Sequence, residues 1–322
     1  AIVRPGSARA TRLTGLACAL LLPVPLLTPE PWLLPVALVL FGAACGAMDV
    51  SMNAQGSALE LRLRRPIMSS LHAGWSLGGL AGAGVVTAGG ASGLEPRAET
   101  IVAAVVLVLL LAICLRRIGD GSGAAVAPSG FVRPSRSVIV LALLCLLIML
   151  TEGAMADWGG VYLAEDLGTS TSTAALAFAA FAAGMTVGRL VGDGLNRRLG
   201  ARTLMRAGSG LAAVALGTVL LTGVPAIAIV GFLLVGLGVA NSVPLLFSAA
   251  GQAGCEPGPN IAAVSALGSI GFLAGPPFIG FLADATSLPL ALSTLCAGLV
   301  IFTLAARAGE GRVTAVAQPE AT

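Results

Sequence analysis

Long apolar runs alternate with short polar breaks along the whole chain. Each run is long enough, as a helix, to cross a hydrocarbon core of ~30 Å at ~1.5 Å per residue. We predict ten such helices, over residues 11–28, 32–60, 67–90, 100–116, 136–158, 172–195, 203–222, 225–249, 261–283 and 288–306. The pattern predicts an all-α, multi-pass membrane protein with the lipid bilayer as its surroundings.

Composition supports this interpretation. The chain is 57% hydrophobic and 10% charged, whereas soluble domains carry roughly 25% charged residues. The first apolar run is one among many, so we predict no cleavable signal peptide. Six cysteines without CxxC spacing and a single histidine argue against a zinc site. The glycines form neither GxGxxG nor GxxxxGK[ST], so we expect no cofactor.

Arginine distribution predicts the orientation in the membrane, because cytoplasmic loops carry an excess of basic residues. The loops on one side hold only Arg97. The opposite loops and both chain ends hold Arg4, Arg9, Arg12, Arg62, Arg64, Arg65, Arg116, Arg117, Arg133, Arg136, Arg197, Arg198, Arg202, Arg206, Arg307 and Arg312. We therefore expect both termini on the cytoplasmic side of the cell (inner) membrane.

The two halves of the chain repeat each other weakly. Arg9 corresponds to Arg202, Asp49 to Asn241 and Ser76 to Ser269, with offsets by subtraction of 193, 192 and 193. Parallel repeats of this kind are typical of transporters. We predict an N-terminal bundle at 1–117, a cytoplasmic linker at 118–135, a six-helix bundle at 136–306 and a disordered tail at 307–322.

The repeat also predicts a missing piece. Two helices precede Arg202 in the second half, whereas only a few residues precede Arg9 in the first. By symmetry about 60 residues, or two helices, are expected upstream of a chain that begins with Ala. We therefore expect ten helices of a twelve-helix protein.

Several segments together resemble the major facilitator superfamily, and within it the fucose-permease-like sugar transporters. They are GAMDVSMNAQGSALE, RRPIMSSLHAGWSLGG, EGAMADWGGVYL, GRLVGDGLNRRLGARTLMR, NSVPLLFSAAG and GFLAGPPFIGFLAD. The resemblance covers almost the whole chain and implies two helical bundles that rock around a central site. One departure is that Arg197 stands where the family's loop motif has an Asp, while Asp193 lies one turn earlier.

An acidic stripe is predicted inside the helix at 32–60. Asp49 lies about 17 residues, or ~26 Å, beyond Trp32 and about 13 residues, or ~20 Å, before Arg62, which places it well inside the bilayer. Asn53, Gly56 and Glu60 follow on the same helix face. A charge there costs roughly 2.5–3.5 kcal/mol, so the stripe should face a cavity or a partner.

Asp49 is the candidate proton carrier, because a carboxyl group withdrawn from water binds a proton more readily. The position matches the proton-linked acid of the resembled group, where the residue is Glu. Asn53 offers donors and an acceptor for a hydroxylated substrate. The alternative, an aspartate that only ties neighbouring helices together, stays open.

His72, Trp75 and Ser76 are candidate substrate-binding residues. His72 matches a substrate-contacting amide position in the resembled group, and Ser76 follows it on the same helix face. Trp75 is suited to stacking on a sugar ring, although helix packing is the commoner role of a Trp. Asn241 is a further candidate, as the repeat partner of Asp49.

Two acids occupy the outer part of the helix at 136–158. Glu152 is the deeper and is our second candidate for proton coupling. Asp157 is a candidate outer gate, since five residues place the two acids about 140° apart unless the helix breaks near Gly153, Gly159 and Gly160.

Four further residues are candidate gating groups near the cytoplasmic end of the helix at 172–195. Arg189 and Asp193, four residues apart, are expected to form an ion pair. Arg198 and Arg202 belong to the loop motif, although the positive-inside rule alone explains Arg residues there.

We therefore expect a monomeric secondary active transporter that moves a small, sugar-like solute by alternating access, coupled to protons. A proton-driven exporter of drugs or metabolites, or a non-transporting remnant, are the alternatives. We expect no enzymatic activity, because HExxH and GxSxG are missing and one histidine leaves little for a triad. No nucleic-acid partner is expected.

Overall fold

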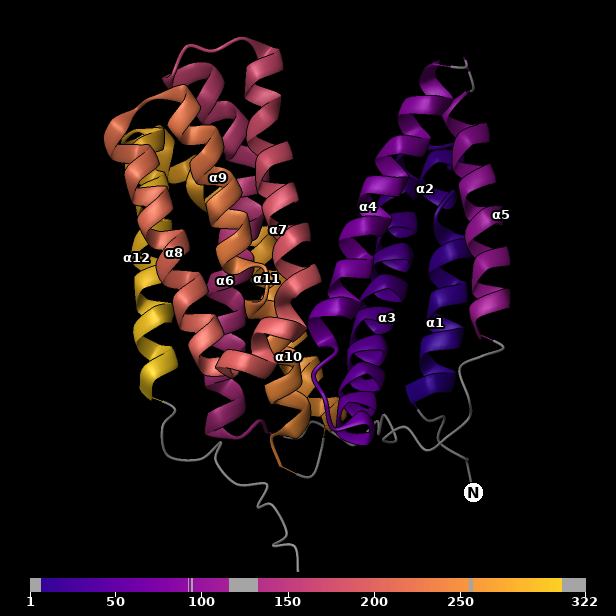
Figure 1. Cartoon of the computed structure of the whole chain (residues 1–322). Helices are drawn as coiled ribbons and strands as arrows, with labels where there is room; N and C mark the ends of the chain where they lie inside the picture. The colour runs from indigo at the N-terminus through magenta and orange to yellow at the C-terminus, as the bar shows by residue number, and fades with distance from the viewer. Residues whose placement is uncertain (1–6, 92, 94, 116–132, 255–256, 309–322) are drawn as a thin grey trace, which may run out of the picture. The chain divides into compact units, whose positions relative to one another are not determined.

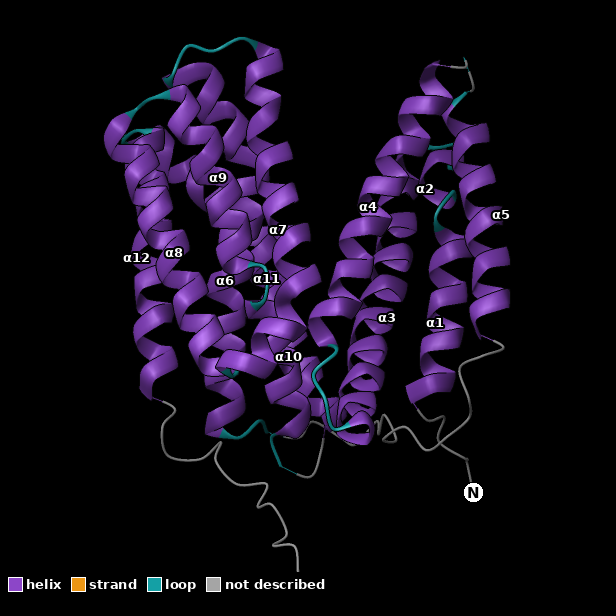
Figure 2. Ribbon diagram, viewed as in Figure 1, coloured by secondary structure: helices purple, strands orange, loops and turns teal. Residues whose placement is uncertain are grey.

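The structure is a computed structural model of the 322-residue chain, and it describes residues 7–91, 93, 95–115, 133–254 and 257–308. The described residues form helices joined by short loops and contain no strand (Figures 1 and 2). The predicted linker at 118–135 and tail at 307–322 fall mostly outside these residues, so they stay predictions.

Each of the ten predicted spans falls on helical structure, and several helices extend beyond the predicted ends. The first span is α1 (Ser7–Leu21) followed by α2 (Val24–Leu27), and the second is the 3₁₀ turn η1 (Pro31–Leu33) followed by α3 (Leu34–Leu63). The later helices are α4 (Met68–Ala91), α5 (Pro96–Leu115), α6 (Arg136–Val161), the π-helical turn η2 (Tyr162–Asp166), α7 (Thr171–Leu199), α8 (Ala201–Thr222), α9 (Pro225–Val239), α10 (Ser242–Gln252), α11 (Pro257–Ala285) and α12 (Leu288–Ala308).

Nine segments of the described residues are long and apolar enough to cross a membrane. The one predicted span that falls outside this set is α4, although its helix has the expected length. Its sequence is rich in glycine and serine, from Ser69 to Gly90, and these residues lower its mean hydropathy. α4 is therefore less apolar than predicted, but it is a helix, as predicted.

Contacts divide the chain into two compact units. Unit 1 contains residues Ala1–Ala142 and Leu246–Ala266, and unit 2 contains Leu143–Leu245 and Leu267–Thr322. The boundary between the units crosses α10 between Leu245 and Leu246, and α11 between Ala266 and Leu267. Unit 1 therefore includes a segment from late in the chain. This segment brings the last part of α10 and the first part of α11 to α3.

Unit 1 is built around α3. α1 packs along α3 and also contacts α5. At the far end of α3 a Cβ at Gly56 would lie 2.8 Å from Leu71, which shows how closely α4 crosses α3 there. Gly251 of α10 is equally close to Ser57, where a Cβ would meet the serine Cβ at 2.6 Å. Small residues therefore let three helices meet around the acidic stripe.

In unit 2, glycines again set the helix crossings. α7 packs on α9, α9 on α8 and α8 on α12. A Cβ at Gly184 would meet the backbone of α9 and one at Gly236 the backbone of α7. On α11, Gly271 and Gly275 face the carbonyls of Leu146 and Leu150 on α6. These two glycines therefore let the backbones of α6 and α11 approach closely.

Candidate functional site

The stripe on α3 carries a hydrogen-bonded carboxylate at its centre. Asp49 is half-buried, and its Oδ2 accepts a bond of 2.6 Å from Ser265 Oγ on α11. Its Oδ1 accepts a bond of 3.0 Å from Asn53 Nδ2, one helical turn further along α3. Donors to a carboxylate stabilise its charged form, so these two bonds offset part of the penalty for placing it in an apolar span.

The chain of bonds continues from Asn53 to α4. Asn53 is almost fully buried, and its Oδ1 lies 3.1 Å from His72 Nε2. The imidazole ring of His72 is itself buried and stacks on Phe247 of α10, with centroids 5.9 Å apart and planes at 24°. Four polar side chains from α3, α4 and α11 thus form one connected line: Ser265, Asp49, Asn53 and His72.

Glu60 closes the turn that orients α4. Its Oε1 accepts the backbone N–H groups of Ile67 and Met68 at 2.8 and 2.9 Å, and its Oε2 accepts a bond from Ser248 of α10. Helix N-termini present unpaired N–H groups, and an acid placed there stabilises them. The predicted stripe member Glu60 is therefore committed to holding the α3–α4 turn, which fixes the position of His72.

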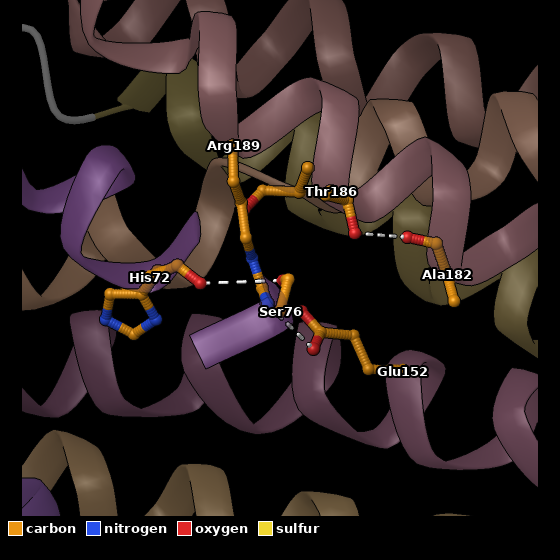
Figure 3. Close-up of polar contacts among 7 residues, drawn as sticks. His72, Ser76, Glu152, Ala182, Thr186 and Arg189 are labelled. Atoms are coloured by element: carbon orange, nitrogen blue, oxygen red, sulfur yellow. Dashed lines mark hydrogen bonds and ion pairs between the residues drawn. The ribbon is translucent and has the colours of Figure 1, made fainter. Parts of the chain in front are cut away.

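Unit 2 contains its own buried charge pair. Arg189 of α7 lies 3.6 Å from Glu152 of α6, measured from Nη2 to Oε2, and both side chains are about nine-tenths buried (Figure 3). The structure thus brings Glu152 to Arg189, and the ion pair of Arg189 with Asp193 that the spacing predicts stays a prediction. The same figure shows Thr186, one turn before Arg189, turned away to the carbonyl of Ala182 at 2.8 Å.

A helix break supplies the second contact of Arg189. The predicted span at 225–249 ends as α9 at Val239 and begins again as α10 at Ser242. Pro244 has no N–H to give to the carbonyl of Ala240, four residues earlier, and its ring crowds that carbonyl. Arg189 Nε donates to this carbonyl instead, at 3.3 Å.

Asn241 lies in the break beside the charge pair. Its Nδ2 donates to the carbonyl of Gly188 at 3.0 Å, which places the amide against the turn of α7 that carries Arg189. Three buried side-chain atoms in this neighbourhood have no hydrogen-bond partner among the described residues: Glu152 Oε1, Asn241 Oδ1 and Ser242 Oγ. A buried polar atom without a hydrogen-bond partner costs free energy, so these three atoms are candidate positions for bonds to a bound group.

The remaining candidates differ in their exposure. Ser76 Oγ is 3.5 Å from the carbonyl of His72, as their spacing predicts (Figure 3). Trp75 is 66% exposed. α6 runs unbroken past Gly153, so Asp157 does not share the face of Glu152 and is exposed. Asp193 is buried in α7, Arg198 is exposed and Arg202 is half-buried. The gating role of the last four residues stays a prediction.

Sequence reasoning missed four contributors. Ser265 bonds to Asp49 across 216 positions, and its sequence carries no signal for that contact. Ser248 is likewise far along the chain from Glu60, and Phe247 is far along the chain from His72. The Ala240 carbonyl was also missed, although Pro244 four residues later was the signal that could have found it.

Membrane-length helices together with carboxylates held inside them define a multi-pass membrane protein. The model of the Major Facilitator Superfamily matches residues 6–254 and 162–317. The chain belongs to that superfamily and is a membrane transporter.

Relatives and solved structures agree with this assignment. An uncharacterized MFS-type transporter of Yersinia pestis is 37% identical over 297 residues, which are 92% of this chain and 77% of that protein. Membrane protein MosC of Rhizobium meliloti is 35% identical over 268 residues, covering 82% and 65%. The crystal structure of the E. coli fucose:proton symporter FucP superposes with a TM-score of 0.72 at 14% identity, covering 94% of this chain and 82% of that one.

Proposed function

We propose that the chain is a proton-coupled transporter that moves a small, hydroxyl- or amine-bearing solute across the cell membrane by alternating access, with Asp49 as its proton carrier. The observation that carries the proposal is the Asp49 carboxylate itself, which lies within a membrane-length helix and is held by Ser265 and Asn53.

Protonation suits this arrangement. Ser265 and Asn53 are uncharged, so no fixed cation holds Asp49 in its ionised form in the bonds that the structure gives it. An uncharged hydroxyl and amide satisfy a carboxylate, and they bind the protonated acid as well, because each offers an oxygen acceptor. The site therefore accommodates both states without rebuilding the helix.

The solute class is inferred from unit 2. Glu152 Oε1 and Asn241 Oδ1 are acceptors, and Ser242 Oγ both donates and accepts, with partners for none of them among the described residues. Such atoms are satisfied by a solute rich in donors, namely hydroxyl or ammonium groups, and not by an anion. The fucose:proton symporter with a similar fold has a neutral sugar as its solute, and this agrees with the inference.

The test is proton movement in proteoliposomes that contain the purified full chain and a trapped pH-sensitive dye. Inositols, neutral hexoses, amino sugars and gluconate are added one at a time, without an imposed gradient. We expect a donor-rich solute, but not gluconate, to drive proton entry. Comparing uptake with efflux in vesicles of both orientations separates import from the exporter alternative.

Asp49→Asn should abolish this proton movement while leaving exchange of labelled solute intact. Asp284→Asn is the matched control, since it makes the same chemical change at an exposed position of α11. Proton movement that survives in Asp49→Asn at the rate of the unmodified protein would show that Asp49 is structural.

A further inference from the structure

The line of bonds from Asp49 to His72 has a fixed direction. When Asp49 is ionised its oxygens only accept, so Asn53 must turn its Nδ2 toward them, as observed at 3.0 Å. That leaves Asn53 Oδ1 toward His72 Nε2, at 3.1 Å. An amide oxygen only accepts, so the proton of a neutral His72 must lie on Nε2 in this state.

When Asp49 binds a proton, the direction of these hydrogen bonds reverses. If that proton lies on Oδ1, this oxygen becomes a donor and requires an acceptor from Asn53. The amide then has to rotate by half a turn, which brings Oδ1 to Asp49 and Nδ2 to His72. Nε2 must now accept, so a neutral imidazole carries its proton on Nδ1. One proton is bound from water at Asp49, while His72 gives one proton to water from Nε2 and takes one back at Nδ1.

The structure also holds the resting orientation in place. Asn53 Nδ2 makes a second bond, of 2.9 Å, to the backbone carbonyl of Asp49. Rotation sacrifices this bond, so the amide does not turn freely and follows the proton on Asp49. Asn53 and His72 are both at least nine-tenths buried, and Phe247 fixes the ring plane. A mismatched pair of donors or acceptors is therefore not relieved by bulk water.

We propose that Asn53 is a two-position amide switch, which passes the protonation state of Asp49 to His72 as a change of imidazole tautomer. The proposal rests on the proposed function only in taking Asp49 as the group that binds the proton. It makes Asn53 and His72 positioning residues that couple the acid on α3 to α4, rather than two separate contacts for a solute.

The other groups recorded around this line within unit 1 are uncharged or engaged elsewhere. α10 presents Phe247 to His72, α11 presents Ser265 to Asp49, and α1 reaches α3 through Thr14. Glu60, the next acid along α3, accepts two backbone N–H groups and a serine hydroxyl. Asp49 is thus a titrating group that the contacts link to His72 through Asn53.

The test uses the single histidine of the sequence. The full chain is purified through a tag without histidine, labelled with ¹⁵N-histidine and placed in lipid nanodiscs. The two imidazole nitrogens then give one pair of NMR signals, which distinguish the two neutral tautomers and the doubly protonated ring. No solute is needed.

We expect the Nε2–H tautomer at high pH and a change to the Nδ1–H tautomer as the pH falls, before the ring becomes doubly protonated. Asp49→Asn should abolish this change, because an amide takes up no proton. Ser265→Ala should keep the change and move it to higher pH, because the ionised carboxylate loses a donor.

The proposal is overturned by a ring that passes from one neutral tautomer directly to the doubly protonated form. It is equally overturned by a tautomer change that persists in Asp49→Asn. Asn53→Leu, which removes the amide and keeps the volume, provides a second test and should also abolish the change. Because the readout involves no transport, a tautomer switch in a protein whose solute movement proves independent of protons would uphold this inference and refute the proposed function.

Discussion

Arg189 Nε donates to the carbonyl of Ala240, and that carbonyl is available because the residue four positions later is Pro244. The carbonyl that lacks a backbone N–H partner in one helix therefore binds a guanidinium group from another helix. The contact fixes the Arg189 side chain next to Glu152, whose charge it offsets. The broken span between α9 and α10 is thus part of how unit 2 keeps a charged pair away from water.

Replacing Pro244 by another residue restores the backbone N–H that competes with Arg189 for the Ala240 carbonyl. In Pro244→Ala the new N–H group bonds to the Ala240 carbonyl, so α9 and α10 join into one helix and Arg189 loses an acceptor. We expect amide hydrogen exchange across residues 240–248 to slow by about tenfold, as one added helical bond of ~1.4 kcal/mol implies. Pro225→Ala is the control, because a proline at the start of α9 replaces no helical bond. Unchanged exchange in Pro244→Ala would show that other contacts cause the break.

The Arg189–Glu152 pair should show strong coupling in stability. Removing one partner leaves the other charge buried, which costs about 3–5 kcal/mol. Arg189→Ala should therefore lower the melting temperature in detergent markedly, and adding Glu152→Gln should recover a large part of the loss. Arg198→Ala, at an exposed position, should change it little. Additive losses in the double variant would mean that the two side chains do not interact.

The crossing of α7 and α9 depends on the absence of side chains. A Cβ at Gly184 would lie 2.8 Å from the backbone N of Leu237 and closer still to the carbonyl of Leu233, and neither backbone atom can move aside as a side chain would. Gly184→Ala should therefore destabilise the protein by about 2 kcal/mol or more. Gly217→Ala in α8, where no atom lies within 4 Å, should instead gain up to about 1 kcal/mol from helix propensity. Equal melting temperatures for the two variants would contradict this account.

Hydropathy was sufficient for the helices, because an apolar run in lipid has to satisfy its own backbone and does so as a helix. It was insufficient for the interruption at Ala240, since a proline inside an apolar run is compatible with either a kink or a break. It carried no information on Gly153, where the lack of a side chain admits the backbone of α11 at Phe272 while α6 stays helical.

The contacts of the candidate site that lie within a single helix were predictable. The four-residue spacing placed Asn53 beside Asp49, and their bond follows from helix geometry alone. The register of α4 against α3 is set by Gly56 and the Glu60 turn, so the contact of His72 with Asn53 was beyond reach. The contact of Arg189 with Glu152 was likewise beyond reach, because it joins α7 to α6, and local spacing in α7 carries no signal for it.

The bond between Ser265 and Asp49 has a consequence for synthesis. The ribosome makes Asp49 216 residues before it makes Ser265, an interval of roughly 10–40 s at typical rates of elongation. During that time α3 enters the membrane without the hydroxyl that later holds its carboxylate. In that interval the bond from Asn53, within α3 itself, is available to the carboxylate, and the arrival of α11 adds the bond from Ser265.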